Sequence, residues 1–330
     1  MEEKMNNKMV WAFMMRISDH MWADDSFAEI ENPMLYMPRS RYFENNNICV
    51  ETWDKMVKFL ADHKYNLLLI DIGDGVKFDS HPEISAPDAW SKEFLKKKLD
   101  EARALGLEVI PKLNFSSAHD TWLKEYRRML STPIYYKVCA DLIAETCELF
   151  DYPRWFHLGL DEECLERQSR HEMIVIRQEK LYWHDANFLF SECEKHGARP
   201  WVWSDYYWLH PEAFIRNMSK EVIQSNWHYG SFMIKDAKGN PYHQYYRVKT
   251  YNDLDEMGFD QIPTMSSYTS QTNAFQTVAH GKNALTEEHI LGYMTSPWSS
   301  TKPDELYLLQ YDAHRMYAAR RDVYPETLNY

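Results

Sequence analysis

Short apolar runs recur along the chain, and segments with helical spacing of apolar residues separate most of them. Each run has the length and the continuous apolar character of a strand that is buried on both faces of a parallel sheet. The candidate strands lie at 9–17, 66–72, 108–115, 155–160, 200–205, 222–227, 261–266 and 290–295. The clearest helices are predicted at 50–63, 91–105, 133–150, 170–195 and about 304–320. This alternation predicts an α/β fold with a parallel sheet, and eight such units predict a closed (β/α)8 TIM barrel.

The barrel is expected to occupy residues 1–330 as a single domain, because no linker rich in Pro, Gly or Ser divides the chain. The stretch at about 19–48, after the first strand, has no clear period and is predicted to be a long functional loop. An open, doubly wound sheet is the alternative fold, but no G-x-G-x-x-G motif follows an early strand. Pro111 within the third strand is unusual, since proline removes one ladder hydrogen bond.

The fourth candidate strand ends in an unusual way. Its apolar and aromatic residues, 155–160, are followed directly by Asp161, Glu162 and Glu163. Barrel enzymes place their chemistry at the C-terminal ends of the strands, so polar residues that close the other strands are expected at the same rim. Those residues are Arg16, Asp19, Asp71, Asp74, Asn114, Asp205, Asn226, Tyr268 and Trp298. Acids predominate among them, which favours chemistry based on carboxylates.

Motifs for several other chemistries are absent from the sequence. There is no G-x-S-x-G nucleophile elbow and no phosphate-binding loop. His119, His157 and His228 are isolated from one another and lack metal-ligand spacing, and an isolated histidine near a strand is more often a hydrogen-bonded core residue. The five cysteines form no C-x-x-C pair, which suits a reducing compartment. We therefore expect neither a metal nor another cofactor.

Charge and composition narrow the range of partners. The net charge of −13 argues against a nucleic acid or an anionic membrane as a partner. No run of ~18 apolar residues is present, and the first residues carry acids rather than a signal peptide, so a cytoplasmic location is expected. The sequence leaves the oligomeric state open. Aromatic residues make up 15% of the chain, which suggests either a large aromatic core or rings that line a carbohydrate pocket.

Carboxylates in an aromatic pocket are typical of glycoside cleavage, where an acid protonates the leaving oxygen and needs a raised pKa. Asp161 and Glu162 are adjacent, and a like charge penalises double ionisation. One of the two is therefore expected to keep its proton nearer neutrality. The alternative is that these acids only begin the next helix, where they complement its dipole.

The run 157–162, His-Leu-Gly-Leu-Asp-Glu, resembles the His-x-Gly-Gly-Asp-Glu motif of the β-N-acetylhexosaminidases of glycoside hydrolase family 20. Segments 64–66 and 81–83 resemble the Lys-x-Asn and Tyr-Pro-Glu segments of that family. Segment 106–111 resembles its Gly-Ile-Glu-Val-Ile-Pro strand, which accounts for Pro111. The residues that fall where the family has pocket tryptophans, an acid and a tyrosine are Trp203, Asp205, Trp227, Tyr268 and Trp298. The resemblance extends from the first strand to Trp298.

The resemblance implies a substrate-assisted mechanism, in which the 2-acetamido oxygen of the sugar attacks the anomeric carbon and the protein supplies no nucleophile. It implies that Asp161 orients the acetamido group, and that Glu162 is the general acid and base. Tyr268 would donate to the acetamido oxygen. The tryptophans implied to wall the sugar are Trp203, Trp227 and Trp298. The implied partner is the terminal N-acetylhexosamine of a glycan.

Several positions depart from the family pattern. Leu160 replaces the second glycine of the motif, Trp11 and Ala12 stand where the family has Arg-Gly, and Ser300 stands where it has a glutamate. The family's third strand ends in Pro-Glu-x-Asp, whereas residues 111–114 of this sequence are Pro-Lys-Leu-Asn. The family's Pro-Gly-His segment is matched only approximately by residues 117–119, Ser-Ala-His. No segment of this sequence resembles the family's separate N-terminal domain. These changes predict altered tolerance at the 3, 4 or 6 positions of the sugar, with a replacement clamp from Arg16, Lys112 or His119.

Two other functions remain open at this point. A glycosidase with two carboxylates would keep Glu162 as acid and use another acid such as Asp205 as nucleophile on a sugar that lacks the acetamido group. A barrel that has lost turnover would only bind glycans.

Overall fold

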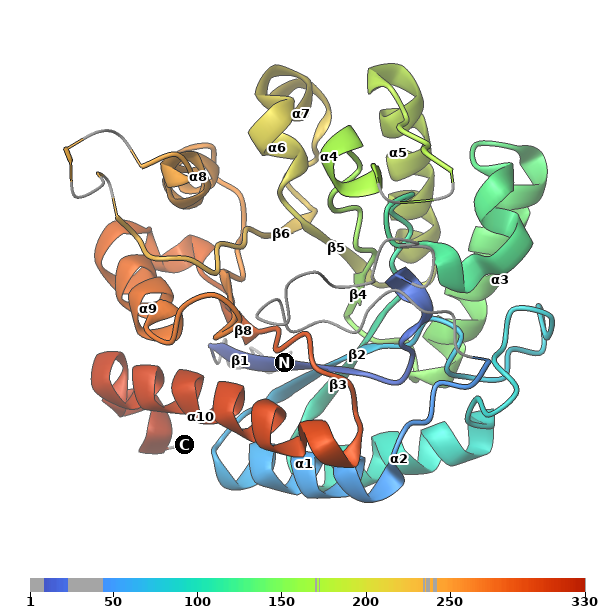
Figure 1. The fold of residues 1–330 in the computed structure, drawn as a ribbon, viewed down its shortest axis with the longest axis horizontal. Helices are drawn as coiled ribbons and strands as arrows, with labels where there is room; N and C mark the ends of the chain where they lie inside the picture. The colour runs from blue at the N-terminus through green and yellow to red at the C-terminus, as the bar shows by residue number, and fades with distance from the viewer. Residues whose placement is uncertain are drawn as a thin grey trace, which may run out of the picture.

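The computed structural model describes residues 9–22, 44–169, 171, 173–233, 235, 238–239 and 242–329. All eight predicted strands are present in these residues, and every pair of neighbouring strands is parallel. They are β1 (Val10–Arg16), β2 (Leu67–Asp71), β3 (Glu108–Lys112), β4 (Trp155–His157), β5 (Arg199–Trp203), β6 (Ile223–Ser225), β7 (Thr264–Met265) and β8 (Gly292–Thr295). Figure 1 shows them gathered at the centre of the molecule, with the helices around them.

The sheet closes into a barrel. β1 pairs with β2 on one side and with β8 on the other, so the first and last strands are neighbours. The seam between β6 and β7 is held by two isolated parallel bridges, Gln224 with Gln261 and Trp227 with Thr264. These contacts confirm the predicted (β/α)8 barrel and exclude an open, doubly wound sheet.

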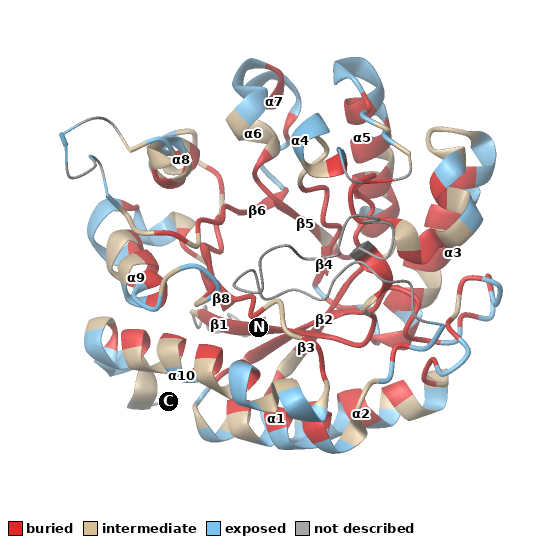
Figure 2. Cartoon of the chain, in the orientation of Figure 1, coloured by how far each residue is buried: buried red, intermediate tan, exposed pale blue. Residues whose placement is uncertain are grey.

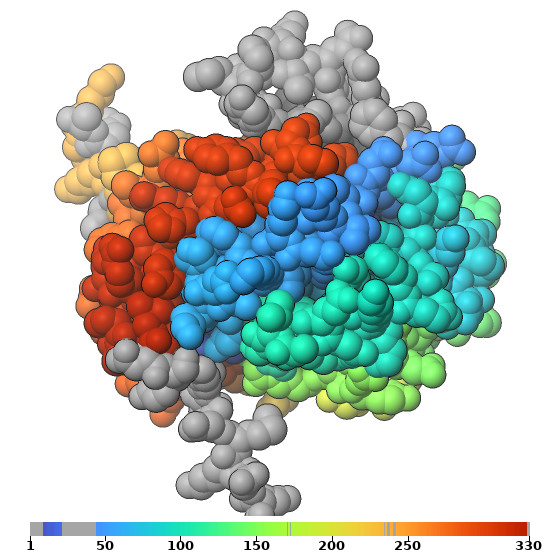
Figure 3. All heavy atoms as spheres, turned by 90° about the horizontal axis from the view of Figure 1, so that it is seen from below, coloured from blue at the N-terminus to red at the C-terminus, as the bar shows by residue number. Residues whose placement is uncertain are grey.

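Helices follow the strands and pack their apolar faces on the outside of the barrel (Figure 2). They are α1 (Val50–Asp62), α2 (Lys92–Ala104), α3 (Pro133–Leu149), α4 (Leu165–Gln168), α5 (Glu179–Lys195), α6 (Tyr206–Leu209), α7 (Pro211–Asn217), α8 (Tyr245–Glu256), α9 (Asn273–Ala284) and α10 (Leu306–Val323). Helices α10, α1 and α2 lie side by side on one face, so the last helix packs next to the first (Figure 3). No helix in the described part of the chain is long and apolar enough to cross a membrane.

Local sequence signals explain where several helices begin. Ser91 caps α2, because its Oγ accepts a hydrogen bond from the backbone N–H of Phe94 at 3.1 Å. Thr132 caps α3 in the same way, and Pro133 occupies the first helical position, where its missing N–H has no cost.

Two predicted segments differ from the structure, and a third lies mostly outside the described residues. The helix predicted at 170–195 begins only at Glu179. In the described residues before it, side chains hold the backbone in an extended path: Gln168 Oε1 accepts from Val175 N, and Glu163 Oε1 accepts from Arg177 N. The strand predicted at 261–266 is paired as a strand only over Thr264–Met265. Of the long loop predicted at about 19–48, a short 3-10 helix (His20–Trp22) and residues 44–48 are described, and residues 23–43 lie outside the described residues.

Alternation along the strands divides the core into two layers. On β1, Trp11, Phe13 and Met15 belong to the layer between strands and helices, whereas Ala12 and Met14 belong to the layer inside the barrel. The inner layer is rich in tryptophan, with Trp155, Trp201, Trp203 and Trp227 contributed by β4 to β6 and the residues after them. The floor below the rim is therefore packed with large rings rather than open.

The packing of α9 gives a test of the fold. Gly281 lies inside this helix, and a Cβ atom there would lie 2.2 Å from Oη of Tyr293, whose buried ring stacks on Trp11. Gly281→Ala is therefore expected to lower the free energy of unfolding by about 1–3 kcal/mol. Helix propensity alone would predict a gain of about 1 kcal/mol.

Urea unfolding of both proteins measures this difference. Asn283→Ala, on the exposed face of the same helix, is the control and should change stability little. A Gly281→Ala protein as stable as the parent would contradict the close packing of α9 against β8.

Candidate active site

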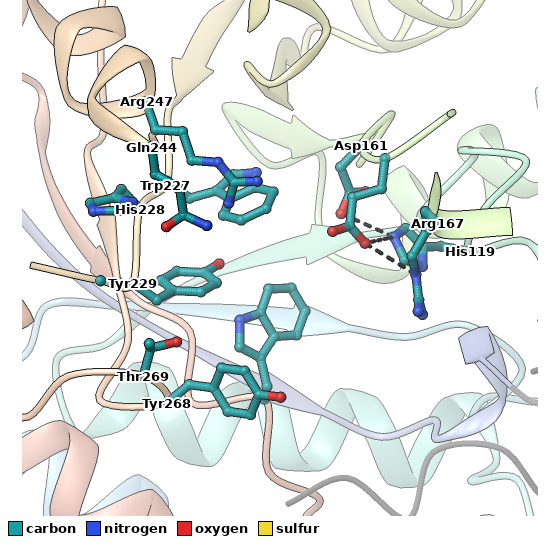
Figure 4. Close-up of a pocket in the computed structure, with 13 residues that line it drawn as sticks. His119, Asp161, Arg167, Trp227, His228, Tyr229, Gln244, Arg247, Tyr268 and Thr269 are labelled. Atoms are coloured by element: carbon teal, nitrogen blue, oxygen red, sulfur yellow. Dashed lines mark ion pairs between the residues drawn. The ribbon is translucent and has the colours of Figure 1, made fainter. Parts of the chain in front are cut away.

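A cavity of about 300 Å³ lies at the C-terminal ends of the strands. It is lined by His119, Asp161, Glu162, Arg167, Trp227, His228, Tyr229, Gly230, Gln244, Arg247, Tyr268, Thr269 and Trp298. Six of these were predicted from the sequence as site residues: His119, Asp161, Glu162, Trp227, Tyr268 and Trp298. Figure 4 shows that Asp161, His119 and Arg167 lie at one end of the cavity, and Trp227, Tyr229 and Arg247 at the other.

The acidic end is built around one histidine. Nε2 of His119 lies 3.2 Å from Oδ2 of Asp161 and 3.2 Å from Oε2 of Glu162. Asn114, at the end of the third strand, donates from Nδ2 to Oδ1 of Asp161 at 2.8 Å. Arg167 Nε lies 3.2 Å from Oε2 of Glu162. Asp161 is thus held on both oxygens, whereas Glu162 is more exposed to the cavity.

The backbone after β4 takes an unusual path that brings these acids together. Gly159 has φ +72°, and a Cβ atom there would lie 2.0 Å from Oδ1 of Asn114. Its N–H donates to Nδ1 of His157 at 3.0 Å, so His157 is a hydrogen-bonded core residue, as predicted. Leu160 and Glu162 have φ +66° and +55°, in the left-handed region that non-glycine residues rarely adopt. Such strained residues cluster at functional sites, where surrounding contacts hold them.

Leu160, which replaces a glycine of the family motif, does not close the cavity. Its side chain is buried and belongs to the apolar layer between strands and helices. It points away from the pair of acids, so the bulky residue is accommodated without blocking them.

The protonation of the two acids differs from the sequence-based prediction. Burial raises the pKa of each, but His119 acts in the opposite direction, together with Lys112 and Asn114 at Asp161 and with Arg167 at Glu162. The pKa of both acids is therefore lowered. Burial opposes a charge on His119, yet the two carboxylates raise its pKa to about 9. The prediction that one of the adjacent acids keeps its proton near neutrality was therefore wrong. The histidine between them carries that proton instead.

Asp205 is a predicted site acid whose pKa is raised, to about 7, by burial and by the charge of Asp161. It follows β5, and it does not line the cavity. Its Oδ2 accepts from the backbone N–H of Glu162 at 2.7 Å, and its Oδ1 accepts from Nε1 of Trp227 at 3.3 Å. Asp205 therefore connects the acid end of the cavity to its aromatic wall.

The other two predicted site residues that do not line the cavity lie behind Trp298. The ring of Trp203 is 6.0 Å from that of Trp298 and only 2% exposed. Arg16, the last residue of β1, donates from Nη2 to the backbone oxygen of Trp298 at 3.0 Å and to Oγ of Ser300 at 3.2 Å. Trp298 has φ +60°, so Arg16 holds a strained backbone that carries a wall of the cavity. Substrate contacts for Trp203, Asp205 and Arg16 stay predictions.

The site also contains residues that the sequence analysis did not select. They include Arg167, Tyr229, Gln244 and Arg247. Tyr229 follows Trp227 at an alternating position, and its ring stacks on Trp227 at 5.1 Å, so continuing the strand periodicity would have found it. The others lie on or beside helices, where no motif marks them.

A second layer supports the loop that carries the acids. The guanidinium of Arg177 is buried and contacts Glu163 at 2.6 Å and Asp185 at 3.1 Å. Glu163 follows Glu162 directly, and Asp185 belongs to α5. Since a buried charge is costly unless paired, this network fixes the loop against the outer helices.

Among the described residues, one group of side chains could ligate a metal ion. It consists of His119, Asp161 and Glu162, and one donor atom from each lies within 4.8 Å of the others. A metal coordinates neutral imidazole, so a cation here would first have to displace the proton of His119, whose pKa is raised to about 9. The same geometry therefore suits a proton better than a metal ion.

No model of a known protein family matches the sequence, and no curated protein does. Solved structures match it in fold. The chitobiase of Flavobacterium johnsoniae is 16% identical with a TM-score of 0.57, and the match covers 97% of this chain and 52% of that one. A family 20 exo-β-N-acetylglucosaminidase from Vibrio harveyi, in complex with N-acetylglucosamine, is 13% identical with a TM-score of 0.58, covering 98% and 58%. A Streptomyces plicatus β-hexosaminidase variant, in complex with N-acetylglucosamine, is 14% identical with a TM-score of 0.60, covering 96% and 68%.

This chain spans just over half the length of the first two of these proteins. The likeness is one of fold. It confirms that the barrel is the one found in family 20 glycoside hydrolases, which the ordered motifs of the sequence had predicted.

The charge on His119 is the first thing to test at this site. We expect its imidazole to be protonated at pH 7.5 and to titrate near pH 9, because Asp161 and Glu162 stabilise the cation. Side-chain NMR of histidine-labelled protein measures this, with His119→Gln identifying the signal. In Asp161→Asn the pKa of His119 should fall, since one of the two anions is gone. A His119 that is neutral at pH 7.5 would contradict the assigned charges.

Proposed function

We propose that this protein is a glycoside hydrolase that acts as a retaining exo-β-N-acetylhexosaminidase, with assistance from the substrate's own acetamido group. The observation that carries the proposal is the pair Asp161 and Glu162, held side by side by His119 at one end of a cavity lined by aromatic rings. The barrel shared with family 20 glycosidases supports the same conclusion.

The cavity fits the exo mode of action. Its volume of about 300 Å³ lies at the small end of the range for ligand sites and suits a single terminal sugar ring. Trp227, Tyr229 and Trp298 supply flat apolar surfaces for the sugar face, and Tyr268 offers a hydroxyl at the rim. In the proposal, that hydroxyl donates to the acetamido oxygen.

The reaction proceeds in two steps. The acetamido oxygen attacks the anomeric carbon while Asp161, an anion, accepts from the acetamido N–H and polarises the group. The glycosidic C–O bond breaks, and the leaving oxygen takes a proton from Glu162. Water then attacks the anomeric carbon of the oxazolinium intermediate, its proton passes to Glu162, and the sugar leaves with retained configuration.

Glu162 receives its proton from His119. In the free enzyme the proton lies on the imidazole, 3.2 Å from Oε2 of Glu162. A bound sugar excludes water and disfavours separated charges, so the proton moves to Glu162, where it is placed for the leaving oxygen.

The geometry gives less support to a mechanism in which Asp205 is a nucleophile. Both of its carboxylate oxygens already accept hydrogen bonds, from the N–H of Glu162 and from Nε1 of Trp227, and the residue does not line the cavity. Trapping of Asp205 by a 2-fluoro sugar would support that mechanism instead. Sugar binding without turnover of any aryl glycoside would indicate a barrel that only binds glycans.

Replacing the proposed general acid tests the function directly. Glu162→Gln should lower kcat on an aryl β-N-acetylglucosaminide by roughly two to four orders of magnitude, because glutamine cannot supply the proton. The parent enzyme should also be inhibited by a thiazoline mimic of the oxazolinium. Glu166→Gln, an exposed acid on α4, is the matched control and should keep the parent rate. Equal rates for Glu162→Gln and the parent would remove Glu162 from the mechanism.

The pH profile tests the source of the proton. Since the His119–Glu162 pair loses its proton as the pH rises through about 9, kcat/KM should fall on a basic limb near that pH. In His119→Gln the limb should move to lower pH by at least one unit, since Glu162 alone must hold the proton. His184→Gln, an exposed histidine on α5, should leave the limb in place. If the basic limb stays at the same pH in His119→Gln, His119 is not the source of the proton that Glu162 donates.

A further inference from the structure

We infer that the sugar bound by this cavity carries an anionic substituent, such as a sulfate or a carboxylate, and that Arg247 binds it. The inference deepens the proposed function and rests on it for the identity of the sugar. It is carried by the position of this one arginine at the end of the cavity opposite the acids (Figure 4).

Aromatic rings fix the direction of Arg247. Its guanidinium carbon lies 4.3 Å from the ring centroid of Trp208 and 4.9 Å from that of Trp227, which itself lines the cavity. These cation–π contacts engage the face of the planar guanidinium, so N–H donors at its edge can face a ligand. Its Nε also donates to Oη of Tyr246 at 3.2 Å.

Arg247 lacks the partner that other arginines of this region have. Within the described residues, no carboxylate oxygen lies within 4.0 Å of its guanidinium. In contrast, Arg167 is paired with Glu162 and Arg177 with Glu163. A half-buried guanidinium with no anionic partner, in a protein of net charge −13, is a site for an anion from outside.

Its place on α8 makes the absence of a partner more costly. Arg247 lies in the first turn of that helix, which contains no acidic residue. The positive end of the helix dipole is there, and it disfavours a cation. A cation in the first turn of a helix, with no anion nearby to offset the unfavourable dipole, is expected at a functional position.

The charges that line the cavity agree with this reading. Two carboxylates, Asp161 and Glu162, face three cations, His119, Arg167 and Arg247. Burial lowers the pKa of His228, so this residue adds no charge. The lining therefore has an excess of one positive charge, which an anionic sugar would neutralise. Since the acids act at the anomeric carbon and the acetamido group, the anion belongs on the remote side of the ring.

Binding of single sugars tests the inference without turnover. The probes are N-acetylglucosamine 6-sulfate, N-acetylgalactosamine 4-sulfate and N-acetylmuramic acid, each compared by calorimetry with its neutral parent sugar. At least one should bind about tenfold more tightly than its parent, the gain expected from a charged hydrogen bond. Arg247→Met should remove about tenfold of that preference, and Arg247→Lys should keep part of it, since lysine retains the charge but not the fork.

Lys249→Met is the matched control, because it removes one positive charge from the exposed face of the same helix. It should keep the preference. The preference of the parent protein for charged over neutral sugars should also weaken as the salt concentration is raised. If Arg247→Met does not fold, this salt dependence is the test of whether the cavity binds an anion. Equal binding of all charged and neutral sugars, or a preference that survives in Arg247→Met, would overturn the inference.

Turnover separates this inference from the proposed function. Hydrolysis of a neutral aryl N-acetylglucosaminide with no preference for charged sugars would overturn the role of Arg247 and leave the proposed function standing. A preference for charged sugars that depends on Arg247, with no hydrolysis of charged or neutral aryl glycosides, would overturn the proposed function and leave the anion site standing.

Discussion

The contact of one imidazolium with two neighbouring carboxylates is the interaction on which the candidate site depends. Asp161 and Glu162 follow each other in the chain, Asp161 is buried and Glu162 is partly buried, and two like charges repel more strongly there than in bulk water. His119 lies between them and offsets that repulsion, which keeps both acids ionised and stores a proton within reach of Glu162. Removing His119 would leave the repulsion between the two carboxylates without this compensation.

This arrangement requires a backbone that the local sequence does not favour. Leu160, Glu162 and Trp298 all have positive φ, at a cost of order 1–3 kcal/mol for each such residue. Polar contacts from distant segments hold them: Asp205 accepts from the N–H of Glu162, and Arg16 binds the carbonyl of Trp298. The barrel is thus the device that maintains these conformations, since it brings the ends of several strands to the same place.

The remote end of the cavity differs from the family pattern in a way the structure explains. Ser300 stands where family 20 enzymes have a glutamate that holds sugar hydroxyls, and its Oγ donates to Asp19 and accepts from Arg16. This part of the rim is therefore occupied by its own hydrogen bonds. The cavity lining opposite the acids comes instead from the region of α8, through Gln244 and Arg247, which is where we infer that the remote side of the sugar binds.

The sequence by itself determined the barrel and the location of its chemistry. Eight apolar runs separated by helical segments require a closed parallel sheet, because each run is too apolar to expose either face. A parallel barrel then gathers the residues that follow its strands, which is why Asp161, Glu162, Trp227 and Trp298 could be predicted to share one rim. These conclusions use only the periodicity and order of residues along the chain.

Only the tertiary structure decided the charges and the remaining lining of the site. Adjacent acids in a sequence predict repulsion, but His119, far away in the chain, reverses the outcome once the third and fourth strands are side by side. Arg247 became visible as a site residue only when the first turn of α8 was placed against Trp227. Electrostatic effects depend on distances through space and on burial, and neither can be read from positions along a chain.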